Sequence, residues 1–117
     1  MNGAAAPISL RSGYRIMWML VMFDLPVVAE QERKEATRFR KDLLDAGFEM
    51  AQCSVYMRCC VTRERTDAMV GKVRAALPSG GKVAILVFTD KQYENMIHFH
   101  GGQETQGLPT SGQLALF

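Results

Sequence analysis

The hydrophobic pattern is densest between Met17 and Phe23, where seven consecutive apolar residues precede Asp24 and Pro26. A short apolar run that ends at a proline is typical of a strand buried on both faces, because proline lacks the amide hydrogen that a sheet ladder needs. We therefore predict a first strand over Ile16–Asp24. Asp24 would stand at its carboxyl end, where it either caps a turn or begins a functional site.

The hydrophobic period becomes helical between Ala29 and Ala46. Apolar residues recur three or four positions apart and form one stripe, made of Ala36, Phe39, Leu43 and Ala46. Gly47 follows directly, and glycine is the residue that most often stands just after a helix. We predict a helix over Ala29–Ala46 whose apolar stripe faces the core.

Further segments complete the pattern. Phe48–Val61 is strand-like, with an irregularity at Gln52–Ser54 that indicates either two short strands or one bulged strand. Thr62 is a typical N-cap for a second helix, which ends before a turn rich in glycine. Lys82–Thr89 contains another apolar run and is predicted to be a strand. Gln92–Phe99 is expected to form a shorter, added strand.

This order of elements predicts an α+β fold of the ferredoxin-like type, β-α-β-β-α-β with an added C-terminal strand. Both helices would cover one face of the sheet. In a chain of this size the other, apolar face needs a cover, so we expect a homodimer through that sheet face.

Three regions follow from this pattern. Residues 1–15 are rich in Gly, Ala and Ser and are expected to form a flexible leader, residues 16–100 the ferredoxin-like domain, and residues 101–117 a C-terminal linker and docking strand. The last residues are apolar again: Leu114, Leu116 and Phe117. Such a tip either is disordered or adds as a strand to a sheet edge of the second subunit or of another protein.

Composition narrows the class of protein. The chain has 117 residues, 48% of them hydrophobic, which suits one soluble globular domain. It contains no apolar run of the roughly 18–20 residues that a membrane helix needs, and no signal-peptide core, so we expect a cytoplasmic protein without a membrane partner. Three cysteines make an odd count, and we expect strand packing rather than disulfides.

Charge is informative where it clusters, since the net charge is only +2. Lys34, Arg38 and Lys41 lie on the helix face opposite the apolar stripe, and we call them the basic face; Arg33 and Arg40 flank it. Such a row suits contacts with a phosphate backbone, although a merely solvated face has the same pattern. Arg58, Arg63 and Arg65 form a second candidate patch.

Several short motifs occur together and in order. They are Phe23–Pro26, Glu32–Lys34, Phe39–Lys41, Gly47–Phe48, Gln52, Ser54–Arg58, Thr89–Asn95 and Leu114–Phe117. In this order and spacing they resemble the CRISPR-associated protein Cas-two family, in the branch that accompanies single-effector nuclease systems. The likeness is strongest over residues 16–100.

The resemblance implies a homodimer in which Asp24 of both subunits binds a divalent metal, Mg²⁺ or Mn²⁺. It implies a metal-dependent endonuclease acting on single-stranded RNA or double-stranded DNA. It also implies a central place in spacer acquisition, where the protein and the Cas-one integrase hold a short DNA duplex and insert it into the CRISPR array. Arg33, Ser54 and Tyr56 are close to positions implicated in the family.

Two hypotheses follow, and they differ in what Asp24 does. In one, the protein is a purely structural scaffold that binds duplex DNA through Arg33, Lys34, Arg38, Lys41 and Arg58. In the other, the paired Asp24 carboxylates form a magnesium site for phosphodiester hydrolysis. The site is sparse, because no other acidic residue or histidine lies near Asp24 in the sequence. An RNA-recognition module is less well supported, since its paired-aromatic strand motif is missing.

Overall fold

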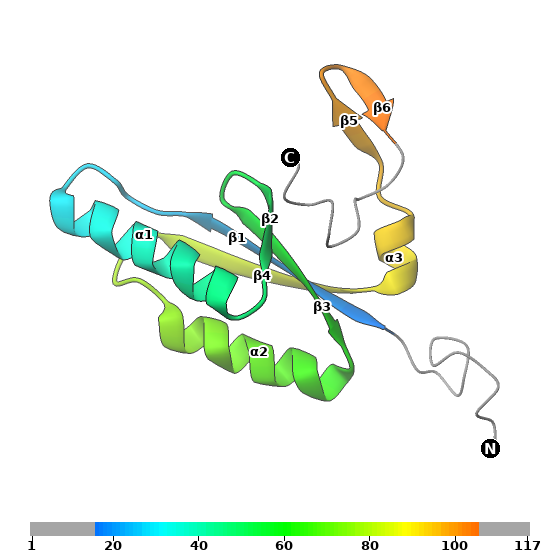
Figure 1. Cartoon of the computed structure of the whole chain (residues 1–117), viewed down its shortest axis with the longest axis horizontal. Coiled ribbons are helices and arrows are strands. Elements are labelled where there is room, and N and C mark those ends of the chain that lie inside the picture. The colour runs from blue at the N-terminus through cyan, green and yellow to red at the C-terminus, as the bar shows by residue number, and fades with distance from the viewer. Residues whose placement is uncertain (1–15, 106–117) are drawn as a thin grey trace.

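The computed structural model describes residues 16–105 (Figure 1). The predicted leader over residues 1–15 and the predicted docking residues Leu114, Leu116 and Phe117 lie outside this part of the chain. Within the described part, no helix is both long and apolar enough to cross a membrane.

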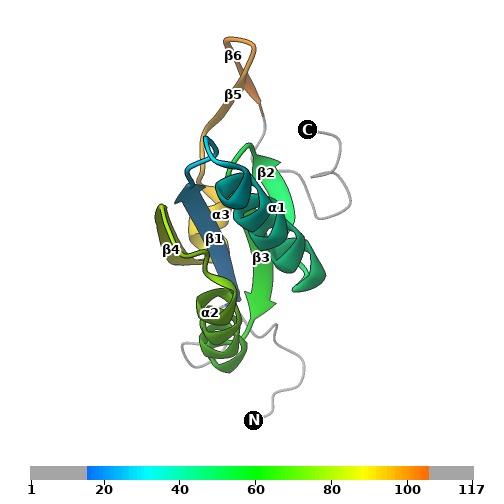
Figure 2. The same ribbon diagram turned by 90° about the vertical axis from the view of Figure 1, so that its left-hand side faces the viewer.

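Four antiparallel strands form the main sheet, in the order β2-β3-β1-β4. They are β1 (Met17–Asp24), β2 (Glu49–Gln52), β3 (Val55–Val61) and β4 (Lys82–Thr89). The helices α1 (Glu30–Asp45) and α2 (Arg63–Ala76) lie on one face of this sheet (Figures 1 and 2). The element order and the strand order together confirm the ferredoxin-like β-α-β-β-α-β prediction.

The core lies between the sheet and these two helices. Along β1 every second residue is buried, and the apolar stripe of α1 packs against them through Phe39 and Leu43. Helix α2 buries Met69 and Val73. The hydroxyl of Thr62 accepts a hydrogen bond from the amide of Arg65 at 3.1 Å, which confirms the predicted N-cap.

The irregularity after Phe48 proves to be a tight turn between two short strands. Cys53 and Ser54 connect β2 and β3, and Ser54 has a φ of +63°, an uncommon conformation for a residue other than glycine. Of the two predicted alternatives, the structure has two strands rather than one bulged strand. Cys53 is exposed in the turn, whereas Cys60 is buried, so strand packing is the wrong interpretation for Cys53.

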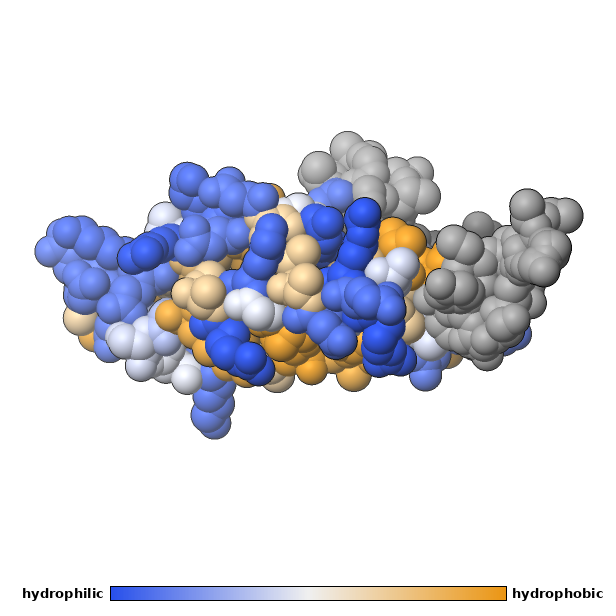
Figure 3. Space-filling view, turned by 90° about the horizontal axis from the view of Figure 1, so that it is seen from below, coloured by the Kyte–Doolittle hydropathy of each residue, from blue (hydrophilic) through white to orange (hydrophobic). Residues whose placement is uncertain are grey.

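Among residues 16–105, the helices α1 and α2 cover only one face of the first strand, which corrects the prediction of burial on both. Trp18, Leu20 and Met22 point away from the helices and are half-buried, and their neighbour Leu86 on β4 is 47% exposed. We call these residues the open face. Hydrophobic residues also form a band along the lower margin of Figure 3, beside the hydrophilic side chains.

The segment after β4 differs from the predicted strand over Gln92–Phe99. It begins with a short helix, α3 (Asp90–Glu94), and continues as a separate hairpin of β5 (His98–His100) and β6 (Gln103–Thr105) (Figure 1). Thr89 and Gln92 cap each other at the start of α3, with bonds of 3.2 and 2.9 Å. The added strand therefore pairs within a hairpin that extends into the predicted linker.

Candidate functional site

Asp24 stands at the carboxyl end of β1, and its side chain is exposed on the same side of the sheet as Leu20 and Met22. Its cross-strand neighbour is Lys82 at the start of β4. Within residues 16–105, the Asp24 carboxylate makes no hydrogen bond or ion pair. It is therefore accessible to an external ligand, beside the apolar open face.

Two turns hold the backbone of β1 where it reaches Asp24. On one side, the amide of Phe23 donates to the carbonyl of Ser54 at 3.1 Å. On the other side, Gly81 (φ +85°) approaches so closely that an added Cβ would lie 2.7 Å from the carbonyl oxygen of Asp24. The position of this carboxylate thus depends on segments that are far away in the sequence.

The donor set of one chain suits half of a metal site. Mg²⁺ prefers oxygen ligands and retains several waters, so an exposed carboxylate is the right chemistry. Within the described residues, no group of three or more His, Cys, Asp or Glu side chains is arranged to hold a metal ion. A second copy of Asp24, related by symmetry, would have to supply the other carboxylate.

The basic face of α1 is exposed, as the sequence predicts. Each of its cations has an acidic neighbour on the same helix: Lys34–Glu30 at 3.9 Å, Arg38–Asp42 at 4.0 Å and Lys41–Asp45 at 2.9 Å. The hydrogen bond from Lys41 to Asp45 raises the pKa of Lys41. Exposed pairs of this kind contribute little, so a phosphate group can replace the carboxylate partner.

The arginines beside the basic face have packing contacts that the sequence did not indicate. Nη1 of Arg33 donates to the carbonyls of Val27 and Val28 at 3.3 and 2.6 Å, which ties α1 to the loop that follows Asp24. The guanidinium of Arg40 lies 5.9 Å from the ring centre of Phe23. Arg33 thus supports the loop from an exposed position, where it remains a candidate for phosphate contact.

Arg58 lies apart from the basic face, at the carboxyl end of α1. Its Nη1 donates to the carbonyl of Ala46 at 2.5 Å, and its Nε is buried without a partner among the described residues. Its guanidinium fills the space where a Cβ on Gly47 would lie. Tyr56 is buried against Phe23, with ring centres 5.6 Å apart, and therefore belongs to the core.

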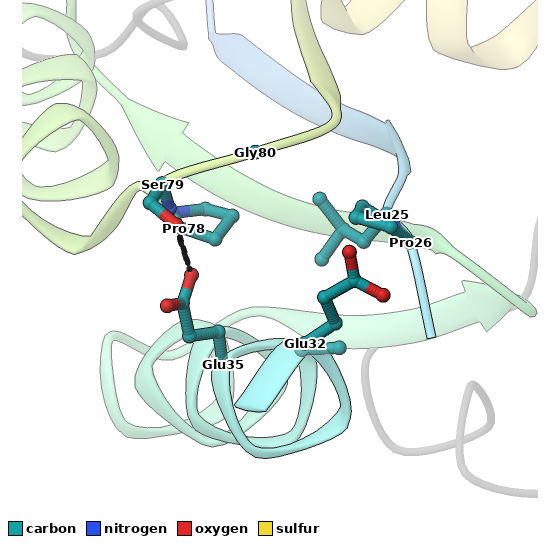
Figure 4. Close-up of a pocket in the computed structure, with 8 residues that line it drawn as sticks. Leu25, Pro26, Glu32, Glu35, Pro78, Ser79 and Gly80 are labelled. Atoms are coloured by element: carbon teal, nitrogen blue, oxygen red, sulfur yellow. Dashed lines mark hydrogen bonds between the residues drawn. The ribbon is translucent and has the colours of Figure 1, made fainter. Parts of the chain in front are cut away.

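A long-range contact that the sequence analysis missed lies on the other side of Asp24. Oε1 of Glu35 accepts hydrogen bonds from the amide and the hydroxyl of Ser79, at 2.9 and 2.8 Å. Figure 4 shows the Glu35 carboxylate directed at Ser79 and the Glu32 carboxylate directed toward Leu25 and Pro26. These residues line a small cavity of about 70 Å³. The two partners are 44 residues apart, so no local pattern indicates this pair.

The fold and this arrangement define a ferredoxin-like protein with a strand-end carboxylate, a sheet face that α1 and α2 leave open, and a basic helix. The model of the family described as CRISPR associated protein Cas2 matches residues 17–96. The chain belongs to this family.

Curated relatives agree with that assignment. A protein of Paracidovorax avenae, named CRISPR-associated endoribonuclease Cas2, is 53% identical over 106 residues, which cover 91% of this chain and 98% of that protein. Proteins of the same name from Flavobacterium psychrophilum and Ligilactobacillus salivarius are 44% and 40% identical, over 89% and 83% of this chain and 90% and 95% of their own lengths.

Proposed function

We propose that this protein acts in the cytoplasm as a homodimer in CRISPR spacer acquisition. It would bind duplex prespacer DNA together with the Cas-one integrase. The two Asp24 carboxylates of the dimer would form a Mg²⁺ or Mn²⁺ site for cleaving single-stranded RNA or double-stranded DNA. A CRISPR-associated role follows from the family, and relatives that carry the name endoribonuclease support the nuclease activity.

The proposed metal site is supported mainly by the exposure of Asp24. Asp24 is exposed without a side-chain partner in residues 16–105, and it borders the open face. If two copies pack their open faces about a twofold axis, the two Asp24 side chains approach each other from opposite subunits. Two carboxylates, with waters, are a suitable donor set for Mg²⁺. Such an ion activates water and offsets the charge that develops on the phosphate.

The alternative function is a scaffold without catalytic activity. Its support is the sparse donor set, since one chain contributes Asp24 and no cluster of three acidic, histidine or cysteine ligands within the described residues. The exposed basic face suits a duplex backbone in either case. The two functions therefore differ in whether a protein with a substituted Asp24 is still active.

Reconstituted prespacer integration with the partner integrase separates them. Asp24→Ala is compared with wild type and with Asp67→Ala, which removes an exposed aspartate from α2. All three proteins are first shown to have the same oligomeric state and duplex affinity. Loss of integration in Asp24→Ala alone would place Asp24 in the reaction. Full integration by Asp24→Ala would leave the scaffold function.

Cleavage is assayed separately on single-stranded RNA and on double-stranded DNA. We expect activity that requires Mg²⁺ or Mn²⁺ and is lost in Asp24→Asn, which keeps the shape of the side chain without its charge. Cleavage at the wild-type rate by Asp24→Asn would reject the proposed nuclease site.

A further inference from the structure

We propose that Glu35 is a positioning residue for Asp24. It would act through the turn of residues 78–81, which it anchors beside the end of β1. The inference rests on the proposed metal site, because it concerns where that carboxylate is held. It assigns a role in the site to a helix residue and a turn that do not themselves offer a ligand to the ion.

Glu35 anchors the turn through its hydrogen bonds to Ser79, which we call the Glu35–Ser79 clamp. One carboxylate oxygen of Glu35 accepts hydrogen bonds from the amide and the hydroxyl of Ser79, at 2.9 and 2.8 Å. The side-chain amide of Gln31 donates a hydrogen bond to the other oxygen at 3.3 Å. These bonds lower the pKa of Glu35, chiefly through the Ser79 amide. Glu35 is therefore held as a charged acceptor, and hydrogen bonds to a charged group are the stronger kind.

The turn in its own right contacts the backbone around Asp24. Gly81 follows the clamp by two residues and lies against three consecutive residues of the strand end. An added Cβ there would lie 2.7 Å from the carbonyl oxygen of Asp24 and 2.9 Å from both Leu25 and Pro26. A shift of the turn therefore pushes on the backbone that carries the Asp24 side chain, because backbone atoms have little room to yield.

The same part of α1 also holds the loop that follows Asp24. Glu32 lies one helical turn before Glu35, and its carboxylate accepts hydrogen bonds from the backbone amides of Val28 and Ala29, at 3.1 and 2.8 Å. Figure 4 shows the Glu35 carboxylate directed at Ser79 of the turn and the Glu32 carboxylate directed toward Leu25 and Pro26. The amino-terminal part of α1 thus fixes both loops that flank Asp24.

Two adjacent glycines give a matched pair of variants. At Gly81, a methyl group meets the Asp24 carbonyl, and the positive φ adds strain. At Gly80, a methyl group meets only a ring carbon of Pro26, at 3.7 Å, which is ordinary contact. We expect Gly81→Ala to displace Asp24 and Gly80→Ala to leave it in place.

The clamp is tested with milder variants that keep the fold. Glu35→Ala removes the acceptor and Ser79→Ala removes one of its two donors, whereas Ser79→Thr keeps both donors. Glu64→Gln is the control for charge, because Glu64 is an exposed acid in the first turn of α2. The expected order of defects is Glu35→Ala, then Ser79→Ala, with Ser79→Thr and Glu64→Gln close to wild type.

Mn²⁺ binding to the dimer, followed by electron paramagnetic resonance, is the first readout. Outer partners of metal ligands commonly change metal affinity by about 10–100-fold. Glu35 and Gly81 do not contact the Asp24 carboxylate itself, so we expect the Mn²⁺ dissociation constant to rise by about 10-fold, the lower end of that range, in Glu35→Ala and Gly81→Ala. Hydrogen exchange of the amides of Asp24, Leu25 and Val27 is the second readout, and it should accelerate in the same variants. Thermal melting shows that each variant is folded under assay conditions.

The outcomes separate this inference from the proposed function. If wild type binds Mn²⁺, Asp24→Asn does not, and the clamp variants bind like wild type, the metal site stands and the positioning role is rejected. If wild type does not bind Mn²⁺, the proposed site fails. Hydrogen exchange at the three amides then decides the positioning role alone: faster exchange in Glu35→Ala supports it, and unchanged exchange overturns it.

Discussion

The indole of Trp18 stacks on the phenol ring of Tyr93, with ring centres 4.0 Å apart and planes 8° from parallel. Nε1 of Trp18 also donates to Oδ1 of Asp90 at 2.9 Å. Trp18 belongs to the open face, whereas Asp90 and Tyr93 belong to α3. This pairing therefore holds α3 over one end of the open face. Leu20 and Met22 lie further along the same face of β1.

Tyr93→Ala tests how much this stack stabilises the fold. Removing the ring abolishes the aromatic stacking and exposes the indole, so we expect the free energy of unfolding to fall by about 1–2 kcal/mol. Urea denaturation followed by tryptophan fluorescence measures it, since Trp18 is the only tryptophan in the sequence. Tyr93→Phe keeps the ring and serves as the control. Equal destabilisation by both variants would show that the hydroxyl, not the stack, matters.

Arg58→Ala separates packing from nucleic-acid binding. The variant leaves the carbonyl of Ala46 without its donor and opens a space beside Gly47. We expect a decrease of about 1–3 kcal/mol in the free energy of unfolding, measured by urea denaturation. Arg63→Ala removes an exposed arginine at the start of α2 and should change stability by less than about 0.5 kcal/mol. Unchanged stability with weaker duplex binding would return Arg58 to the nucleic-acid interface.

Much of the fold could be predicted because its signals are local. The apolar stripe through Phe39 and Leu43, the N-cap at Thr62 and the break after Asp24 each depend on neighbours in sequence. Helix α3 was missed although Thr89 and Gln92 form a capping pair, since five helical residues are too few for a clear period. The apolar run of β1 did not reveal that its second face is only half-buried among residues 16–105.

The site could be predicted only in its exposed parts. Asp24 and the basic face follow from residue type and spacing. The Glu35–Ser79 clamp and the hydrogen bond from Arg58 to Ala46 join segments that meet only after folding. Sequence patterns therefore indicated which side chains offer charge, but not which of them support the backbone around the site.

The basic face is expected to control the salt dependence of duplex binding. Each phosphate that a cation no longer neutralises makes the slope of log affinity against log salt shallower by about 0.9. Changing Lys34, Arg38 and Lys41 to glutamine should therefore weaken binding and flatten the slope by up to about 2.7. A variant with the same change in charge elsewhere is the control: Lys72→Gln, Arg74→Gln and Lys91→Gln. If both variants bind equally weakly, net charge rather than the basic face attracts the duplex.

Glu35 should make stability depend on pH in the acid range. Its pKa is lowered from 4.5 by the hydrogen bonds of Ser79 and Gln31, so the folded state prefers the charged form. This contribution is fully present above the unfolded pKa and is lost as the pH falls through the lower folded value. Urea denaturation from about pH 7 to about pH 3 should show the gap between wild type and Glu35→Gln closing below pH 4.5. A stability difference between wild type and Glu35→Gln that stays constant with pH would contradict this linkage. Ser79→Ala should make the pH dependence of stability smaller, because it removes one of the hydrogen bonds that lower the pKa of Glu35.

Dimerisation through the open face should depend on Leu86. Leu86 and Leu77 are 47% and 48% exposed, but Leu86 lies on the open face and Leu77 follows α2. A glutamate at position 86 would be buried without a partner in the dimer, which costs about 3–5 kcal/mol. We expect Leu86→Glu to raise the dimer dissociation constant by at least about 100-fold in analytical ultracentrifugation, and Leu77→Glu to leave it unchanged. A wild-type monomer, or a dimer that Leu86→Glu does not weaken, would show that the two Asp24 carboxylates do not meet across this face.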